Sequence, residues 1–378
     1  MTLFATMDPS TTDAIRILGA VGDVFGSRTI GYSMHVADVA ARFMLYRERE
    51  PEAIAVVYFA AALHRIGAVR VVVPRDSSPR VTEIAGWDDP PGGAAIVAAA
   101  RVFPRATADA VRWHREAFDG TGFPDQLRWD SIPEAAMTIN IARAFVSSLE
   151  AQGALGSPRD AIFGLESESG CVFSLAAMRE FREFVEAEGA ECDAPYACTW
   201  PLPQADPAAL IGLICADIDS RQARTAGRGD RLERIVRTIV GRLGEPRLDA
   251  DRAAFAGRLT ALARTGTDGS TDDIFTLSRL GLEARAARAQ TAARILQTAP
   301  SFAAYAPSVR ATEEWFDGSG LPDGAAGEAI DPIARVLAVA IAAEALTAPD
   351  ASRRIAGAGG TRLDPAVVRA YLGTEVAP

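Results

Sequence analysis

The sequence has no excess of basic residues and no very long apolar run. Its 378 residues carry 39 Lys and Arg against 49 Asp and Glu, a net charge of −10, so binding to a nucleic-acid polymer or to an anionic membrane surface is not expected. Apolar runs such as LIGLICA and VLAVAIAA fall far short of the roughly 20 residues that span a bilayer. The start, MTLFATMDPSTTD, has no basic stretch and is unlike a signal peptide. We therefore expect a cytoplasmic protein.

Cysteine motifs are also lacking. Cys171, Cys192, Cys198 and Cys215 show no Cys-x-x-Cys spacing, which excludes a disulfide scaffold and a zinc knuckle as first interpretations. We expect four reduced thiols.

What the sequence does contain favours helices. Hydrophobic residues make up 49% and charged residues 23%, and Ala and Arg are abundant. Apolar residues recur at helical spacing in 37–48 and 53–67, and the almost entirely apolar stretch 333–346 predicts a core helix. Residues 69–74, VRVVVP, could form a brief extended segment. The predicted fold class is all-α.

The chain shows internal similarity, and its length favours two domains. Three pairs of segments match in the same order, at offsets of 196, 198 and 190 residues. The pairs are 23–36 with 217–232, 118–145 with 316–343, and 170–181 with 360–371. We therefore predict two tandem helical bundles related by duplication.

A boundary is predicted where prolines interrupt regular structure, at Pro195, Pro201 and Pro203. It divides the chain into a first domain at 1–188, a Pro-rich linker at 189–204 and a second domain at 205–378.

Five segments of the first half carry a resemblance to a known family. They occur in the order YSMHVA (32–37), LHRIGA (63–68), DDPPGG (88–93), HREAFDGTGFP (114–124) and INIARAF (139–145). This order and spacing resemble the HD-GYP family, a subgroup of the HD-domain phosphohydrolases associated with cleaving cyclic di-GMP. The resemblance covers nearly the whole chain, once per half, and implies an HD-type fold in each.

The family's chemistry needs two or three metal ions held by His and carboxylate side chains, because the metals activate water and neutralise phosphate oxygens. In the first half most of these positions have changed. Tyr32 stands at the first ligand His, Arg65 at the Asp of the His-Asp pair, and Asp89 at the His of His-Pro. Arg115 stands at the second His of His-His-Glu, and Arg143 at the Asp of the apolar helix.

Only His64 and His114 remain as good ligands in the first half. Together with Asp89 they could form a remnant site of two histidines and one carboxylate, and iron or manganese is expected only if that site is functional. Otherwise no cofactor is expected, since the fixed charges of nearby arginines would repel a cation.

The second half departs further from the family. The corresponding positions carry Arg228, Arg264, Glu313 and Ile341, with no histidine. The resemblance thus implies a degenerate enzyme, without catalytic residues that we can assign.

Arginine replaces metal ligands repeatedly, which gives two hypotheses. Arg65, Arg115 and Arg143 could form a metal-free receptor for a phosphate anion, such as a cyclic dinucleotide. Alternatively, these arginines pair with carboxylates such as Glu116 and Asp89, or Glu313 in the second half, and merely fill the vacated cavity.

The FDGTGFP stretch resembles the family's GYP loop. Gly120 and Gly122 permit unusual backbone angles, Pro124 fixes the exit, and Phe123 replaces Tyr. Asp119 is expected to bond main-chain amides within the turn, as is Asp317 in the second half. The loop is therefore expected to be kept for its shape.

Three functions remain open. The chain could be an inactive regulatory or scaffold protein in bacterial signalling, a residual metal-dependent phosphodiesterase acting on cyclic di-GMP, or a platform for a protein partner without a small ligand. Metal analysis and nucleotide binding would separate the first two.

Overall fold

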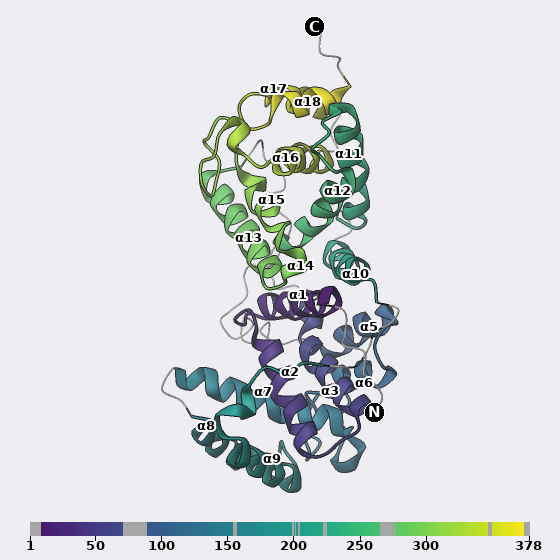
Figure 1. The fold of residues 1–378 in the computed structure, drawn as a ribbon, viewed down its shortest axis with the longest axis vertical. Coiled ribbons are helices and arrows are strands. Elements are labelled where there is room, and N and C mark those ends of the chain that lie inside the picture. The colour runs from purple at the N-terminus through teal and green to yellow at the C-terminus, as the bar shows by residue number, and fades with distance from the viewer. Residues whose placement is uncertain are drawn as a thin grey trace. The chain divides into compact units, whose positions relative to one another are not determined.

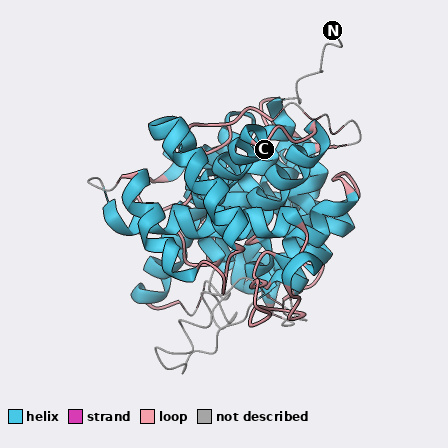
Figure 2. Cartoon of the chain, turned by 90° about the horizontal axis from the view of Figure 1, so that it is seen from below, coloured by secondary structure: helices cyan, strands magenta, loops and turns pink. Residues whose placement is uncertain are grey.

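The computed structural model describes residues 9–70, 89–153, 157–198, 200, 202, 205–221, 225–264, 275, 277–346 and 350–373. This part of the chain consists of helices, turns and isolated β-bridges and contains no β-strand (Figure 2). The prediction of an all-α fold is confirmed. Of the segment expected to be extended, residues 69 and 70 lie in a 3₁₀ turn, and residues 71–74 lie outside the described residues.

The chain divides into two compact units, Met1–Leu210 and Ile211–Pro378. α10 (Pro207–Ser220) contains the division. The first unit is built from eight further α-helices in the described residues (Figure 1). They are α1 (Pro9–Phe25), α2 (Tyr32–Tyr46), α3 (Pro51–Leu63), α5 (Pro90–Ala100), α6 (Arg105–Trp113), α7 (Glu134–Gln152), α8 (Pro158–Leu165) and α9 (Leu175–Glu188).

The core of the first unit forms around α3, whose sequence PEAIAVVYFAAAL is apolar on all sides. Pro51 occupies the first turn, where the missing amide hydrogen costs nothing, and every residue from Ile54 to Leu63 is buried. The stretch Pro51–Arg70 is long and apolar enough to cross a membrane, yet 89% of its apolar window is buried inside the protein. α3 is therefore a core helix, and it packs against α1, α2, α6 and α7.

The segment predicted as a linker begins with contacts to α2. The Arg42 side chain donates a 2.6 Å hydrogen bond from Nε to the Ala194 oxygen, and the Asp38 carboxylate accepts the Tyr196 amide at 3.0 Å. The Tyr196 ring also lies 5.8 Å from that of Tyr58. Residues 194–196 thus pack on the first unit.

The second unit is built around α16 (Pro332–Ala345), the predicted core helix. In Figure 1 it lies at the centre of this unit, with α11 (Arg228–Leu243) and α12 (Ala250–Leu259) on one side and α13 (Arg279–Gln297) and α15 (Ala306–Arg310) on the other. The remaining α-helices of the described part are α14 (Pro300–Ala303), α17 (Ala351–Gly357) and α18 (Pro365–Leu372).

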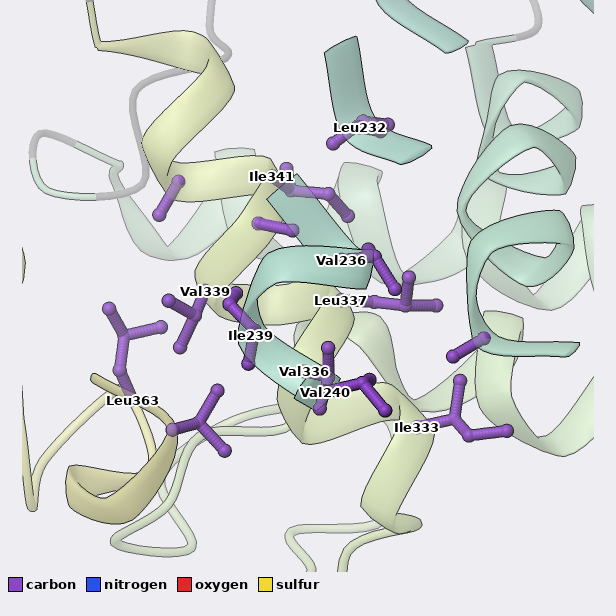
Figure 3. Packing of buried hydrophobic residues seen from close by; sticks show 14 of the residues in the cluster. Leu232, Val236, Ile239, Val240, Ile333, Val336, Leu337, Val339, Ile341 and Leu363 are labelled. Carbon is purple, nitrogen blue, oxygen red and sulfur yellow. The ribbon is translucent and has the colours of Figure 1, made fainter. Parts of the chain in front are cut away.

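The apolar face of α11 packs against α16 in this core. Leu232, Val236 and Ile239 are fully buried and belong to one cluster with Val336 and Leu337 (Figure 3). Each buried side chain of this size contributes roughly 1.5–3 kcal/mol by leaving water. The polar face of α11 consequently points away from the core.

Several helices begin with the same dipeptide. Asp89, Asp331 and Asp364 each precede a proline and occupy the N-cap, where the carboxylate accepts main-chain amides of the first turn. Asp supplies the acceptor that the free amides need, and Pro at the next position has none to satisfy. The Asp-Pro pair therefore marks a helix start at all three places.

Candidate functional site

Two histidines of the first unit meet in its interior. His64 follows α3 and His114 follows α6, and neither has any exposed surface. Their ring centroids lie 5.2 Å apart, edge to face at 80°. Each Nδ1 donates to a main-chain oxygen three residues earlier, that of Ala61 at 2.6 Å and that of Val111 at 2.7 Å. These bonds fix both rings, so the fold brings together the two predicted ligands.

Tyr32 lies next to this pair at the start of α2. Its ring centroid is 5.9 Å from that of His64, and the residue is 2% exposed. Its hydroxyl contacts Ser147 Oγ at 2.9 Å and donates to the main-chain oxygen of Arg143 at 3.2 Å. Where the resemblance places a ligand histidine, a buried phenol therefore links α2 to α7.

Arg65 is also inside the unit, 2% exposed. Its Nη2 donates a 2.6 Å hydrogen bond to the main-chain oxygen of Gly26, and its guanidinium carbon lies 6.0 Å from the centroid of the Tyr32 ring. A Cβ on Gly26 would lie 2.2 Å from the Arg65 guanidinium. The absence of a side chain at residue 26 thus provides the space for this cation.

The other two predicted arginines are half-buried. Arg143 on α7 donates from Nη2 to Asn140 Oδ1 at 2.8 Å, and Asn140 in turn donates to the Glu116 main-chain oxygen at 2.9 Å. The main-chain oxygen of Arg115 accepts the amide of Phe123 at 3.1 Å. Arg115 therefore lies beside the FDGTGFP stretch, and Arg143 is linked through Asn140 to Glu116, just before it.

Asp89 has a structural task of its own. Its carboxylate accepts the Gly92 amide at 3.0 Å as the N-cap of α5, and its main-chain oxygen accepts the Gly93 amide at 2.7 Å. A Cβ on Gly67 would lie 1.9 Å from that main-chain oxygen, so α5 and the turn after α3 are in close contact. Asp89 was expected to pair with arginines, but its carboxylate binds the α5 main chain.

The described residues do not form a complete donor set for iron or manganese. His64 and His114 have the right chemistry, with Nδ1 held by carbonyl oxygens as in many metal-binding histidines. However, no group of three or more His, Cys, Asp or Glu side chains in the described ranges is placed to hold a metal. Arg65 lies beside the pair, and a guanidinium cannot give up its charge.

The loop after His114 is held by one buried carboxylate. Glu116, 2% exposed, accepts the amide of Asp125 at 2.6 Å and that of Leu127 at 3.0 Å. Within the loop, Asp119 accepts the amide and the hydroxyl of Thr121, and these bonds lower the pKa of Asp119. Glu116 was expected to pair with arginine, but its carboxylate binds main-chain amides.

The glycines of this loop are required by its shape. Gly120 has a φ of 83°, and a Cβ on Gly122 would lie 2.0 Å from the amide nitrogen of Ala117. The Phe123–Pro124 peptide bond is cis, and the Phe123 ring is 47% exposed. The loop is thus a tight structure in which the Phe123 ring faces solvent.

The second unit repeats this loop contact by contact. Glu314 accepts the amides of Asp323 at 2.7 Å and Ala325 at 3.0 Å, and Asp317 accepts the amide and hydroxyl of Ser319. Leu321 precedes the cis proline, as Phe123 does in the first unit. These residues lie 198 positions after their counterparts.

Each unit has a buried aspartate near the end of a helix, Asp23 in α1 and Asp219 in α10. Asp23, fully buried, accepts the amides of Gly31 and Ser33 at 3.0 Å and the Ser33 hydroxyl at 2.5 Å. Burial raises the pKa of Asp23 to about 6, although these hydrogen bonds and the charge of Arg65 act in the opposite direction. In the second unit, burial likewise raises the pKa of Asp219.

The predicted arginines of the second unit lie next to carboxylates. Arg228 Nε lies 3.4 Å from Glu344 Oε2, and both side chains are more than 90% buried. Arg264 Nε lies 3.9 Å from Asp219 Oδ1. Ion pairs occupy these positions.

Two further members of the predicted set lie elsewhere in the second unit. Glu313 receives two hydrogen bonds from Arg285, at 2.8 and 2.9 Å. Ile341 belongs to the apolar core.

Comparison with known proteins gives a match within this unit. Residues 215–358 match the HD-domain family. The whole chain is also similar in fold to a crystal structure described as a cyclic GMP-AMP specific phosphodiesterase in V. cholerae, V-cGAP3, with a TM-score of 0.64 over 98% of both chains. The sequence identity is 17%, so this likeness concerns the fold. No curated protein matches the chain.

The residues that match the HD-domain family therefore lie in the half that departs further from the ligand pattern. Its α11, α12, α13 and α16 carry the ion pairs and the apolar core described above.

Glu116 and Glu314 were missed as loop anchors by sequence reasoning. The signal was present, because the same Glu stands three residues before the Asp of both loops.

Proposed function

We propose that this protein is a tandem, degenerate HD-GYP-type regulator of bacterial cyclic-dinucleotide signalling that binds a phosphate anion without hydrolysing it. The observation that carries the proposal is the buried Arg65 next to His64. At this position the resemblance implies a metal-binding carboxylate, and the chain instead holds a permanent cation. A charge of the same sign as the metal opposes metal binding at the same place.

The tandem arrangement is supported by the shared contacts of the two units. Two loops with a cis proline, a Glu anchor and an Asp turn recur at a constant offset. Unrelated helical bundles have no reason to share so many main-chain hydrogen bonds in the same order. We infer that the two halves arose by duplication.

Recognition of an anion is supported by the charges around Tyr32. The guanidinium of Arg28 lies 4.8 Å and that of Arg65 6.0 Å from the centroid of its ring, and its hydroxyl contacts the main chain of Arg143. Arg65 is committed to Gly26, so in this proposal Arg115 and Arg143 contact the ligand. Guanidinium groups bind phosphate oxygens through paired charge-assisted hydrogen bonds.

A cyclic dinucleotide is the proposed ligand because the similar structure is named as a phosphodiesterase specific for cyclic GMP-AMP. A cytoplasmic location follows as part of the same proposal, since such signalling nucleotides act inside the cell. We also propose a protein partner that binds the chain when the nucleotide is bound.

The test combines metal analysis, hydrolysis and binding. The purified full chain is expected to hold no stoichiometric iron or manganese and to leave cyclic GMP-AMP and cyclic di-GMP intact when these metals are added. Calorimetric titration with each nucleotide is expected to show saturable binding that is at least tenfold weaker in Arg143→Asp. Arg159→Asp, which changes an exposed arginine on α8, is the matched control and should bind as the unchanged chain does.

Two results would overturn this function. Metal-dependent turnover of either nucleotide would show an enzyme. Equal binding by Arg143→Asp and Arg159→Asp, or no binding at all, would remove the proposed receptor site.

A metal-dependent phosphodiesterase is the second candidate, and the histidine pair favours it. His64 and His114 lie with Nδ1 bonded to carbonyl oxygens, an orientation that suits metal ligands. If the chain is an enzyme, turnover will depend on added iron or manganese and will be lost in His114→Ala.

A further inference from the structure

A basic hollow lies on the second unit, formed by α11, α17 and α18, which Figure 1 shows as neighbours near the C-terminal end. Its volume is about 490 Å³, within the range of sites for small molecules. Arg231, Arg234 and Arg242 contribute to its wall from α11, and Ser352 and Tyr371 contribute from the other two helices.

The hollow follows from the two faces of α11. Leu232, Val236 and Ile239 bury one face in the core (Figure 3). The arginines of the wall occupy positions on the other face, as the helical period of 3.6 residues requires. Ile235 and Leu372 add apolar surface to the wall, so it can contact both a charged group and a flat ring.

The acids of α11 are engaged away from the hollow. Asp230 and Glu233 both accept hydrogen bonds from Arg258, and Glu233 also accepts one from Arg237. Neither acid contributes to the wall of the hollow. Glu344 pairs with Arg231 at 2.6 Å. Even so, the wall carries more positive than negative charge, in a chain whose net charge is −10.

Two of the three guanidinium groups are held in place by the protein. Arg231 donates to Glu344 and to the main-chain oxygen of Ala226. Arg242 donates from Nη1 to the main-chain oxygens of Ala370 and Tyr371 at 3.0 and 2.8 Å, at the end of α18. Fixed donors of this kind lower the entropy that a ligand must lose on binding.

Arg234 has most of its donors available. It makes one long contact, 3.4 Å from Nε to the Asp230 main-chain oxygen. Its terminal nitrogens donate to no residue in the part of the chain that the structure describes, and the side chain is exposed. A guanidinium fork in a hollow with other cations matches the oxygens of a phosphate group.

We propose that this hollow binds a phosphate monoester of mononucleotide size. Arg234 and Arg242 contact the phosphate, Tyr371 and Ser352 offer hydroxyl groups to the rest of the ligand, and Ile235 and Leu372 pack against its ring. The site belongs to the second unit and uses none of the residues assigned above to anion binding in the first unit.

The experiment is calorimetric titration of the full chain with AMP, with adenosine as the probe that lacks phosphate. We expect saturable binding of AMP, weaker at higher salt, and no detectable binding of adenosine. Arg234→Gln should weaken AMP binding about tenfold, since one charge-assisted contact is lost. Arg353→Gln, an exposed arginine of α17 outside the wall, is the matched control and should bind as the unchanged chain does.

The proposal is overturned if AMP shows no saturable binding, if adenosine binds equally well, or if Arg234→Gln binds AMP as tightly as Arg353→Gln. Because Arg234 is exposed and its substitution buries nothing, a folding defect is not expected, and circular dichroism checks this. Arg143→Asp should leave AMP binding here unchanged. This variant therefore separates the hollow from the site proposed in the first unit.

Discussion

Arg65 joins the end of α3 to the end of α1 by donating a 2.6 Å hydrogen bond to the main-chain oxygen of Gly26. Both partners lie inside the first unit, so the bond has no solvent to replace it. Arg65→Ala would leave a cavity and an unsatisfied carbonyl group. We expect it to lower the free energy of unfolding by about 2–4 kcal/mol, measured by urea denaturation together with hydrogen exchange of α3.

The matched control for this change is Arg159→Ala, because Arg159 is exposed on α8. It should alter the free energy of unfolding by no more than about 0.5 kcal/mol. Equal stability of the two variants would show that Arg65 has no structural role.

The loop anchors give a second prediction. Glu116→Ala would leave the amides of Asp125 and Leu127 without their acceptor, and a hydrogen bond to a charged group contributes about 1.5–3 kcal/mol. Hydrogen exchange at these two amides should accelerate, and Glu314→Ala should do the same at Asp323 and Ala325.

Arg112→Ala is the comparison for Glu116→Ala. It removes the exposed ion pair with Asp125, which is worth at most about 1 kcal/mol. If this variant accelerates exchange as much as Glu116→Ala does, the anchoring role of the buried carboxylate is refuted.

Asp23 predicts a dependence of stability on pH. Its pKa is raised from 3.8 to about 6, chiefly because burial disfavours the charged form. Between about pH 4 and pH 6 the unfolded chain is ionised at this residue while the folded chain keeps the proton, so stability falls as the pH rises. Above this window Asp23 is ionised in both the folded and the unfolded chain, so it no longer changes the stability with pH.

The change is measured as the difference between the unchanged chain and Asp23→Asn, from urea denaturation at pH 4 to 7. Relative to Asp23→Asn, we expect the unchanged chain to lose at most roughly 3 kcal/mol of stability as the pH rises from 4 to 7. Other titrating groups cancel in the difference. A difference that stays flat over this range, or that moves in the opposite direction, would contradict the burial of Asp23.

Much of the fold could be predicted because helical periodicity survives in the sequence. The apolar stretch 333–346 was expected to be a core helix and is found as α16 at Pro332–Ala345. Such predictions succeed because the spacing of apolar residues indicates which face of a helix is buried.

The site could be predicted only in part. The resemblance implies that His64 and His114 are ligand positions, and the fold brings their rings together. The direction of a long side chain cannot be predicted in this way, because it depends on tertiary contacts. Arg65 can bond the Gly26 oxygen only because residue 26 lacks a Cβ, and these residues are far apart in sequence. The N-cap role of Asp89 had a local signal, because Pro90 follows it and the Asp-Pro pair marks a helix start. The resemblance instead suggested a ligand at this position.

The buried pair of Arg285 and Glu313 gives the last prediction. Two hydrogen bonds, at 2.8 and 2.9 Å, join the side chains, and each side chain is 10% exposed or less. Arg285→Met would strand the Glu313 carboxylate and should cost about 3–5 kcal/mol, whereas the double change Arg285→Met with Glu313→Leu should recover most of that loss. Urea denaturation of the single and double variants forms the cycle. Additive losses would mean that the pair is not coupled, while recovery would show that a replaceable structural ion pair occupies this position, which the resemblance aligns with a family ligand.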